Sequence, residues 1–239
     1  KTDAAAVVNL PPSDPYFQYY DLGVPTYFVS DARPGEREAG LPALQAIARD
    51  HREIWLIPFS YGSEGDHFVE QYLASTCFKT REAWFGHIRL AHYAVPQASA
   101  EPRRSVQATF LHANGQIHLT GYALAPATPR PGEVLSLTLY WQSGGPTAKP
   151  YTVFTHLYDA DGRIRAQRDG EPVGGKRPTT GWRLGEDIAD NYGLQLPADL
   201  PSGEYRLAVG LYLLEDGSRL QLSDGENRVV LTTVQVARP

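Results

Sequence analysis

The stretch EVLSLTLYW, residues 133–141, alternates apolar and polar side chains almost from end to end. In an extended strand, successive side chains point to opposite faces of the sheet. One face of this stretch would carry three leucines and Trp141, and the other would carry Ser136, Thr138 and Tyr140. The pattern predicts a strand with one face in a hydrophobic core, and it assigns Trp141 to that core.

The same two-residue period continues through residues 107–239. Further segments with strand character read VQATFLH, QIHLTGYAL, YTVFTHLYD, RIRAQRD, DIADNYGLQL, EYRLAVGLYL and RVVLTTVQVA. Gly, Pro and Asp residues separate these segments, and no helical period intervenes. This part of the chain is predicted to form an antiparallel β-sandwich of the jelly-roll or immunoglobulin-like kind.

The first 97 residues follow a different pattern, in which apolar runs alternate with helical periods. Strands are predicted over 4–10, 24–30, 52–59 and 83–95, and helices over 13–23, 41–50 and 66–76. This order predicts a small three-layer α/β domain of Rossmann-like outline, with a largely parallel sheet. The polar, proline-containing residues 98–106 are predicted to link it to the sandwich.

The turn after the first predicted strand argues against a dinucleotide site. It reads LPPSDP, residues 10–15, where such sites have a glycine-rich loop. Proline has no backbone N–H and blocks the close approach that a pyrophosphate needs. We therefore expect no cofactor.

The amino-acid composition indicates a globular protein and argues against some classes of partner. The chain has 239 residues, of which 42% are hydrophobic and 21% charged, as in globular proteins. A net charge of −5 gives no basic surface for nucleic acid. Cys77 is the sole cysteine, and no apolar run reaches the length of about 18 residues that spans a membrane. The abrupt start and the absence of Met suggest a piece of a longer or processed polypeptide.

Two loop motifs resemble ion or phosphate sites. Asp159 and Asp161 in DADG could bind calcium, but Asp-Gly between two strands is more typical of a hairpin turn. The segment GEPVGGKR, residues 170–177, resembles a phosphate loop, yet Arg177 stands where Ser or Thr is required and a proline follows. We interpret both as surface turns.

The histidines do not form a metal motif. None of the seven has the spacing of a zinc site. His87 and His92 would fall on opposite faces of one strand, and His112 and His118 could face each other across a hairpin. No nucleophile elbow is present, so no catalytic residue is predicted.

Candidate ligand-binding residues lie in the sandwich half. Trp182, in a loop, could offer a ring to a sugar or could close the end of the sandwich. Glu186, Asp187 and Asp190 are typical of a charged, solvated strand edge, whereas Asp169 and Asp190 across a cleft would suit a glycosidase. The candidates are Trp182, Tyr192, His156, Gln167, Asp169, Arg183 and Asp190.

Several segments resemble a known family. They are PGEVLSLTLYW, YTVFTHLYDADGRIRAQRDGEP, PTTGWRLGEDIADNYGLQLP and LPSGEYRLAVGLY, with FQYYDLGVPTYFV, EIWLIPF and DHFVEQYLA in the first half. Together they resemble the C-terminal soluble region of bacterial multi-pass membrane glycosyltransferases of the dolichyl-phosphate-mannose protein mannosyltransferase and aminoarabinose transferase group. The likeness consists of strand and turn patterns and covers most of the chain.

The resemblance implies a role outside catalysis. The family's catalytic acid lies in a loop between transmembrane helices, and this sequence contains no such helices. We therefore expect a non-catalytic accessory region on the extracytoplasmic side of a bacterial membrane. Its implied partners are the membrane-embedded part of the same parent chain and an acceptor glycan or protein. A structural or protein-docking module and a free-standing glycoside hydrolase are the alternatives.

Overall fold

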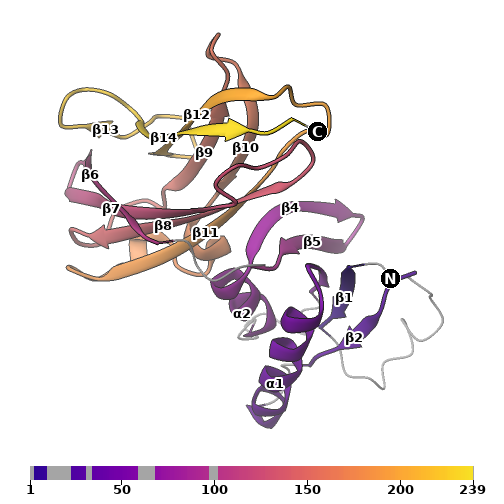
Figure 1. Ribbon diagram of the computed structural model, residues 1–239. Helices are drawn as coiled ribbons and strands as arrows, with labels where there is room; N and C mark the ends of the chain where they lie inside the picture. The colour runs from indigo at the N-terminus through magenta and orange to yellow at the C-terminus, as the bar shows by residue number, and fades with distance from the viewer. Residues whose placement is uncertain (1–2, 10–22, 31–33, 59–67, 97–101, 239) are drawn as a thin grey trace. The chain divides into compact units, whose positions relative to one another are not determined.

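The computed structural model describes residues 3–9, 23–30, 34–58, 68–96 and 102–238. The chain divides into two compact units, Lys1–Gln97 and Ala98–Pro239 (Figure 1). Strand β6 begins at Arg104, so it takes up the last residues of the predicted linker. Each unit is described by itself.

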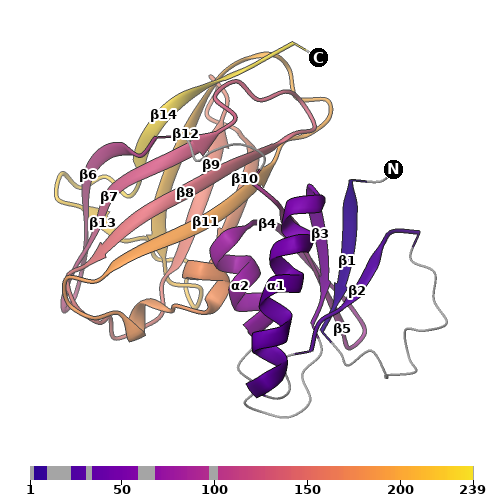
Figure 2. The same ribbon diagram turned by 60° about the horizontal axis from the view of Figure 1, so that its bottom comes forward.

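The second unit contains two antiparallel sheets, whose strands appear one sheet behind the other in Figure 2. In the first sheet the order is β13 (Gln221–Leu222), β6 (Arg104–His112), β7 (Gly115–Ala125), β8 (Val134–Ser143) and β11 (Asp187–Gln195). In the second it is β10 (Ile164–Gly170), β9 (Thr152–Tyr158), β12 (Gly203–Tyr212) and β14 (Val229–Val236). The antiparallel β-sandwich is confirmed, and its jelly-roll or immunoglobulin-like kind stays a prediction.

The core of the sandwich follows from the alternation in β8. Leu135, Leu137, Leu139 and Trp141 are all fully buried. On the second sheet, Leu157 of β9 lies opposite Leu207 of β12, and both are fully buried. Each large apolar side chain removed from water contributes about 1.5–3 kcal/mol. A shift of register by one residue would expose the whole set, so this pattern fixes the fold.

The first unit contains a five-stranded mixed sheet and two described helices. The strand order is β2 (Thr26–Phe28), β1 (Ala4–Val8), β3 (Glu53–Ile57), β5 (Ile88–Ala94) and β4 (Phe78–Phe85). The first three strands are parallel, whereas β5 pairs antiparallel with both β3 and β4. Leu44 of α1 (Pro34–Asp50) and Leu73 of α2 (Phe68–Thr76) share one buried cluster with Val7, Ile54 and Tyr93.

The predicted strand over 83–95 is wrong, because a hairpin turn interrupts it. β4 ends at Phe85, β5 begins at Ile88, and Gly86 has a φ of 61°, which glycine adopts without steric cost. His87 therefore lies in the turn and does not share a strand with His92. The antiparallel hairpin also makes the sheet mixed, not largely parallel. The predicted helix over 13–23 lies almost wholly outside the described residues, so the three-layer arrangement stays a prediction.

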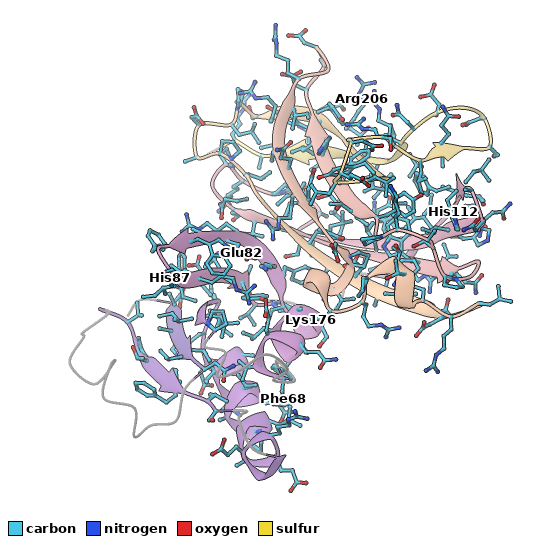
Figure 3. The ribbon with its side chains drawn as sticks, turned by 180° about the vertical axis from the view of Figure 1, so that it is seen from behind. Phe68, Glu82, His87, His112, Lys176 and Arg206 are labelled. Atoms are coloured by element: carbon cyan, nitrogen blue, oxygen red, sulfur yellow. The ribbon has the colours of Figure 1, made fainter. Side chains whose placement is uncertain are left out.

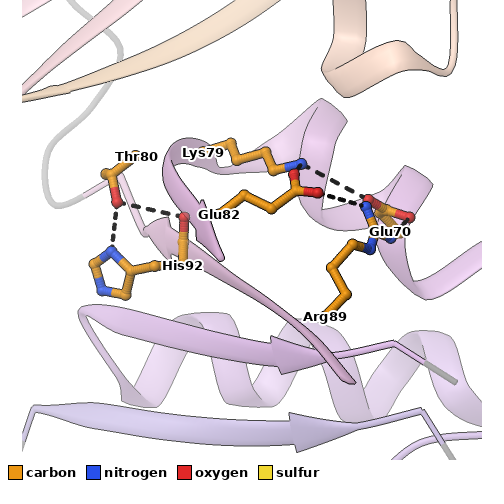
Figure 4. A network of polar contacts seen from close by, with 6 residues as sticks. All are labelled: Glu70, Lys79, Thr80, Glu82, Arg89 and His92. Atoms are coloured by element: carbon orange, nitrogen blue, oxygen red, sulfur yellow. Dashed lines mark hydrogen bonds and ion pairs between the residues drawn. The ribbon is translucent and has the colours of Figure 1, made fainter. Parts of the chain in front are cut away.

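Four charged side chains fasten the β4–β5 hairpin to α2 (Figure 4). Glu70 of α2 is almost completely buried, and Nη2 of Arg89 donates to its Oε2 at 2.6 Å. Nζ of Lys79 lies 3.9 Å from Oε1 of Glu70 and also pairs with Glu82, which accepts from Arg89 as well. Two acids and two bases thus form one neutral group, which we call the charged quartet.

Replacing Glu70 with Gln is expected to destabilise the first unit. The change leaves Lys79 and Arg89 in a buried place with less negative charge, and breaking a buried ion pair costs about 3–5 kcal/mol. Urea titration followed by circular dichroism measures the free energy of unfolding, with Glu38→Gln on the exposed surface of α1 as the control. Equal stability of the two variants would contradict a structural role for the quartet.

Candidate ligand site on the sandwich

The candidate residues separate into three places. Asp190 and Tyr192, on β11, point into the sandwich and are buried. Trp182 and Arg183 belong to the loop between β10 and β11. His156, Gln167 and Asp169 lie on β9 and β10 of the second sheet, where His156 pairs with Gln167.

Asp190 is an interior carboxylate, only 1% exposed. It accepts hydrogen bonds from Trp141 Nε1 at 3.2 Å, Tyr192 Oη at 2.7 Å and the backbone N–H of Val173 at 2.7 Å. The prediction of a solvated strand edge is therefore wrong for Asp190. A buried indole N–H and a buried phenol need an acceptor, and Asp190 supplies one to both.

The contact with Val173 fixes an unusual turn beside β11. Val173 has a φ of 54°, a region that β-branched residues rarely adopt and that costs about 1–3 kcal/mol. The short 3-10 segment Pro172–Gly175 lies against β11, and the bond from Val173 to Asp190 holds it there. Asp190 thus joins the end of β10 to the inner face of β11.

Burial raises the pKa of Asp190 to about 6, although its three hydrogen bonds oppose the rise. In the unfolded chain the pKa returns to its ordinary value of about 3.9. The folded protein therefore holds a proton that the unfolded chain has lost between these two values. By linkage, this group stabilises the fold at low pH, and its contribution falls as pH rises through about 6.

We expect the free energy of unfolding of the wild-type chain to fall relative to that of Asp190→Asn as pH rises from about 4 to 7. The size is on the order of 2–3 kcal/mol, from a pKa difference of about two. Urea denaturation of both proteins at a series of pH values gives the difference, in which other titrating groups cancel. Parallel stability profiles would show that Asp190 keeps an ordinary pKa.

Trp182 closes one end of the sandwich. It is 1% exposed, and its Nε1 donates to the backbone carbonyl of Arg177 at 2.9 Å. Thr179, also buried, bonds through Oγ1 with Thr147 Oγ1 at 2.7 Å and with the backbone N–H of Tyr151 at 3.0 Å. The indole offers no free face to a sugar, so the interpretation as a plug holds and the platform interpretation is wrong.

Arg183 is part of the same loop. Its backbone N–H donates to Oε2 of Glu186 at 3.0 Å, and Oε1 of that carboxylate accepts from Arg177. The carboxylate therefore organises the turn before β11. Asp187 keeps the solvent-exposed position expected of a charged strand end, whereas Glu186 is half-buried and Asp190 is buried.

Truncating Trp182 is expected to destabilise the sandwich strongly. Trp182→Ala removes a fully buried ring at a cost of about 3–5 kcal/mol, and Trp182→Phe should cost less because it keeps most of the packing. Leu184→Ala is the matched control, since Leu184 lies two residues away and is 79% exposed. Thermal and urea unfolding measure the series, and a neutral Trp182→Ala would contradict the role of a plug.

A polar cluster occupies the outer face of the second sheet, meaning the face turned away from the first sheet. Oη of Tyr158 lies 3.0 Å from Nδ1 of His156, and Nε2 of His156 lies 3.3 Å from Oδ1 of Asp169. Burial raises the pKa of Tyr212, and the charge of Asp169 and a hydrogen bond to it add to the rise. We call Tyr158, His156, Asp169 and Tyr212 the His156 cluster.

The contact between His156 and Asp169 is incomplete. Nε2 and Oδ1 are within ion-pair distance, yet both are buried and neither has a hydrogen-bond partner of good geometry among the described residues. The carboxylate favours the tautomer with the proton on Nε2, which leaves Nδ1 to accept from Tyr158. Nε2 of His156 and Oδ1 of Asp169 therefore lie close together without forming a hydrogen bond of good geometry.

Arginines and aromatic rings surround this cluster. The guanidinium carbon of Arg219 lies 4.4 Å from the ring centre of Phe154, and that of Arg228 lies 4.8 Å from the ring centre of Tyr158. Arg206 pairs in register with Tyr158 and is exposed (Figure 3). Across the part of the chain that the structure describes, none of these three arginines has an ion pair.

The Phe154 ring occupies space that is left free by a glycine on the neighbouring strand. A Cβ atom on Gly210, its neighbour on β12, would overlap the Phe154 ring and would lie 2.8 Å from the carbonyl oxygen of Asn227. The ring therefore packs flat over this position, at 4.7 Å from the ring of His156 between centres. Phe154 is itself fully buried, with the Arg219 guanidinium over its ring.

Two proposed pairings do not occur. Asp190 points into the sandwich from one sheet, whereas Asp169 lies on the outer face of the other, so they do not face each other across a cleft as a glycosidase needs. His112 pairs with Gly115 and His118 with Thr109, so the two histidines are not opposite each other. The tight turn at residues 113–114 sets this register.

The acidic residues of the DADG motif form contacts within their own hairpin. Asp159 accepts from the backbone N–H of Arg163 and from Arg165, and Asp161 pairs with Arg163, so the hairpin prediction is confirmed. Within the described ranges, no group of three acidic, His or Cys side chains could hold a metal ion. Burial raises the pKa of Cys77 to about 11, which disfavours the thiolate.

The sequence alone predicts some of the residues on the outer face. His156, Gln167 and Asp169 were predicted, but Phe154 and the three arginines were not. Arg206, Arg219 and Arg228 come from β12 and the segment after it, and only the strand register places them beside β9. The alternation of Phe154, His156 and Tyr158 on one face was the available signal.

Comparison with known proteins leaves the function open. No protein-family model matches the chain, and no curated protein matches it. The solved C-terminal domain of wzt is similar over 58% of this chain and 81% of its own, with 12% identity and a TM-score of 0.41. A domain of a putative cell surface protein from Methanosarcina acetivorans covers 56% of this chain and 94% of its own, with 14% identity and a TM-score of 0.31. Likenesses this distant assign neither a ligand nor a site.

Neither described helix is long and apolar enough to cross a membrane.

Proposed function

We propose that this chain is a non-catalytic, extracytoplasmic accessory region of a bacterial membrane glycosyltransferase, and that the outer face of its sandwich contacts an acceptor glycan. The strand and turn patterns quoted above support the parentage. The His156 cluster is the observation that carries the glycan contact.

The chemistry of the outer face suits an anionic sugar. Gln167 and Asp169 supply hydrogen-bonding groups for hydroxyls, whereas Phe154 and Tyr158 are buried and pack against the cluster. Guanidinium groups bind carboxylate and phosphate in two-point geometry, and Arg206, Arg219 and Arg228 border the cluster. A glycan that carries uronic acid or phosphate groups would use both the hydrogen-bonding groups and the guanidinium groups.

A structural or protein-docking module is the second candidate. Its supporting observation is the burial of Trp182, Tyr192, His156 and Asp190, which removes four of the seven candidate residues from direct contact with any ligand. This candidate predicts that substitutions on the outer face change neither glycan binding nor stability.

The glycan contact predicts a specific loss of affinity. An array of acidic and neutral bacterial oligosaccharides, followed by calorimetry on the best ligands, should show binding by the wild-type chain. Asp169→Asn and Arg219→Ala should each weaken it about tenfold or more, because a hydrogen bond to a charged group contributes about 1.5–3 kcal/mol.

Asp161→Asn and Arg163→Ala serve as matched controls in the exposed β9–β10 hairpin turn. They change the same residue types away from the His156 cluster and should bind as the wild type does. Absence of binding across the array, or equal loss in the controls, would favour the structural module. Circular dichroism of each variant separates lost binding from lost fold.

A further inference from the structure

The β4–β5 hairpin ends in an exposed apolar segment, AWFGHI, residues 83–88, which we call the hairpin tip. Trp84 is 65% exposed, Phe85 is 64% exposed and Ile88 is 44% exposed. The tip contains no Asp, Glu, Lys or Arg, and His87 lies in its turn (Figure 3). Adjacent exposed aromatic residues are unusual on a protein surface that meets only water.

Each face of the tip carries an exposed apolar side chain. Phe85 lies opposite Ile88 and shares a face with it, whereas Trp84 lies opposite Arg89 and projects from the other face. A helix or sheet that packed on one face would leave the other in water. Only an environment that contacts both faces would cover all three exposed side chains.

The charges nearest the tip neutralise one another. Glu82 and Arg89 flank it, and both belong to the charged quartet with Glu70 and Lys79. The quartet has no net charge, and its ion pairs hold the base of the hairpin to α2. The tip is therefore a neutral projection on a fixed support, which is compatible with entry into an apolar medium.

The size of the tip argues against a protein partner. A fully buried aromatic side chain buries about 150–250 Å², and about a third of each ring is already covered here, so the tip could bury roughly 250–400 Å² more. A stable protein interface needs about 800 Å² on each side. Shallow insertion into a bilayer has no such requirement, since a few apolar side chains suffice and tryptophan favours the headgroup region.

We propose that the hairpin tip inserts into the interfacial region of a lipid bilayer, with Trp84, Phe85 and Ile88 among the upper acyl chains. The β4–β5 hydrogen bonds satisfy the backbone of the strands, and the turn at Gly86 and His87, at the apex of the tip, enters the interfacial region with these side chains. The inference does not depend on the glycan contact, which concerns the other unit.

Vesicle flotation with the whole chain tests the proposal. Phosphatidylcholine vesicles and vesicles that also contain phosphatidylglycerol should both carry the wild-type chain, because the tip is neutral. Trp84→Ser/Phe85→Ser should lower the partition coefficient about tenfold or more, as expected for two large apolar side chains returned to water. Leu214→Ser is the matched control, a 73% exposed leucine of the second unit, and should float as the wild type does.

Tryptophan fluorescence adds a direct readout. Vesicles should shift the wild-type emission to shorter wavelength, and lipids brominated in the upper acyl chain should quench it, both through Trp84. Failure of the wild-type chain to float with either vesicle would overturn the proposal. Flotation that requires anionic lipid and survives the double substitution would overturn it too, and so would a wild-type dimer that the double variant abolishes.

Discussion

A carboxylate inside a β-sandwich is tolerable only when donors surround it, and Asp190 meets that condition with the side chains of Trp141 and Tyr192 and the backbone of Val173. These partners come from β8, from β11 itself and from the segment after β10. The interaction therefore joins two strands of one sheet to the edge of the other. Burying the Asp190 carboxylate costs desolvation free energy. This cost is compensated because the carboxylate accepts hydrogen bonds from three buried donors, which are costly to leave without an acceptor.

The outer face depends on this arrangement through β10. The end of β10 is held by Val173, and the register of β10 on β9 places Gln167 beside His156 and Asp169 beside Phe154. On the other side of β9, the register with β12 places Arg206 beside Tyr158. An interior polar bond thus helps to position an exterior polar cluster, and Tyr192 connects the two because its hydroxyl donates to the carbonyl of Gly170, the residue after Asp169.

Periodicity alone was enough to predict the sandwich, because alternation of apolar residues in β8 allows one buried face and one solvent-facing side. It failed for residues 83–95, where a single apolar run hides a turn that depends on Gly86 alone. It also failed for Asp190, since the sequence cannot show that an acid on a strand faces buried N–H and O–H groups. The outer face was recognised in part, since His156 and Asp169 lie on adjacent strands, but its arginines depend on pairings between distant segments.

The loop that contains Trp182 is long, yet two of its side chains are anchored in the interior of the sandwich. Thr179 is fully buried and bonds to the 147–151 segment, and the indole of Trp182 is fastened to the backbone at Arg177. A protease needs an extended stretch of accessible chain in its active site, and this loop cannot supply one without first releasing Thr179 and Trp182. Cleavage there would follow unfolding of the sandwich end, so a sequence rich in Gly, Pro and Thr encodes a segment that should resist digestion in the native protein.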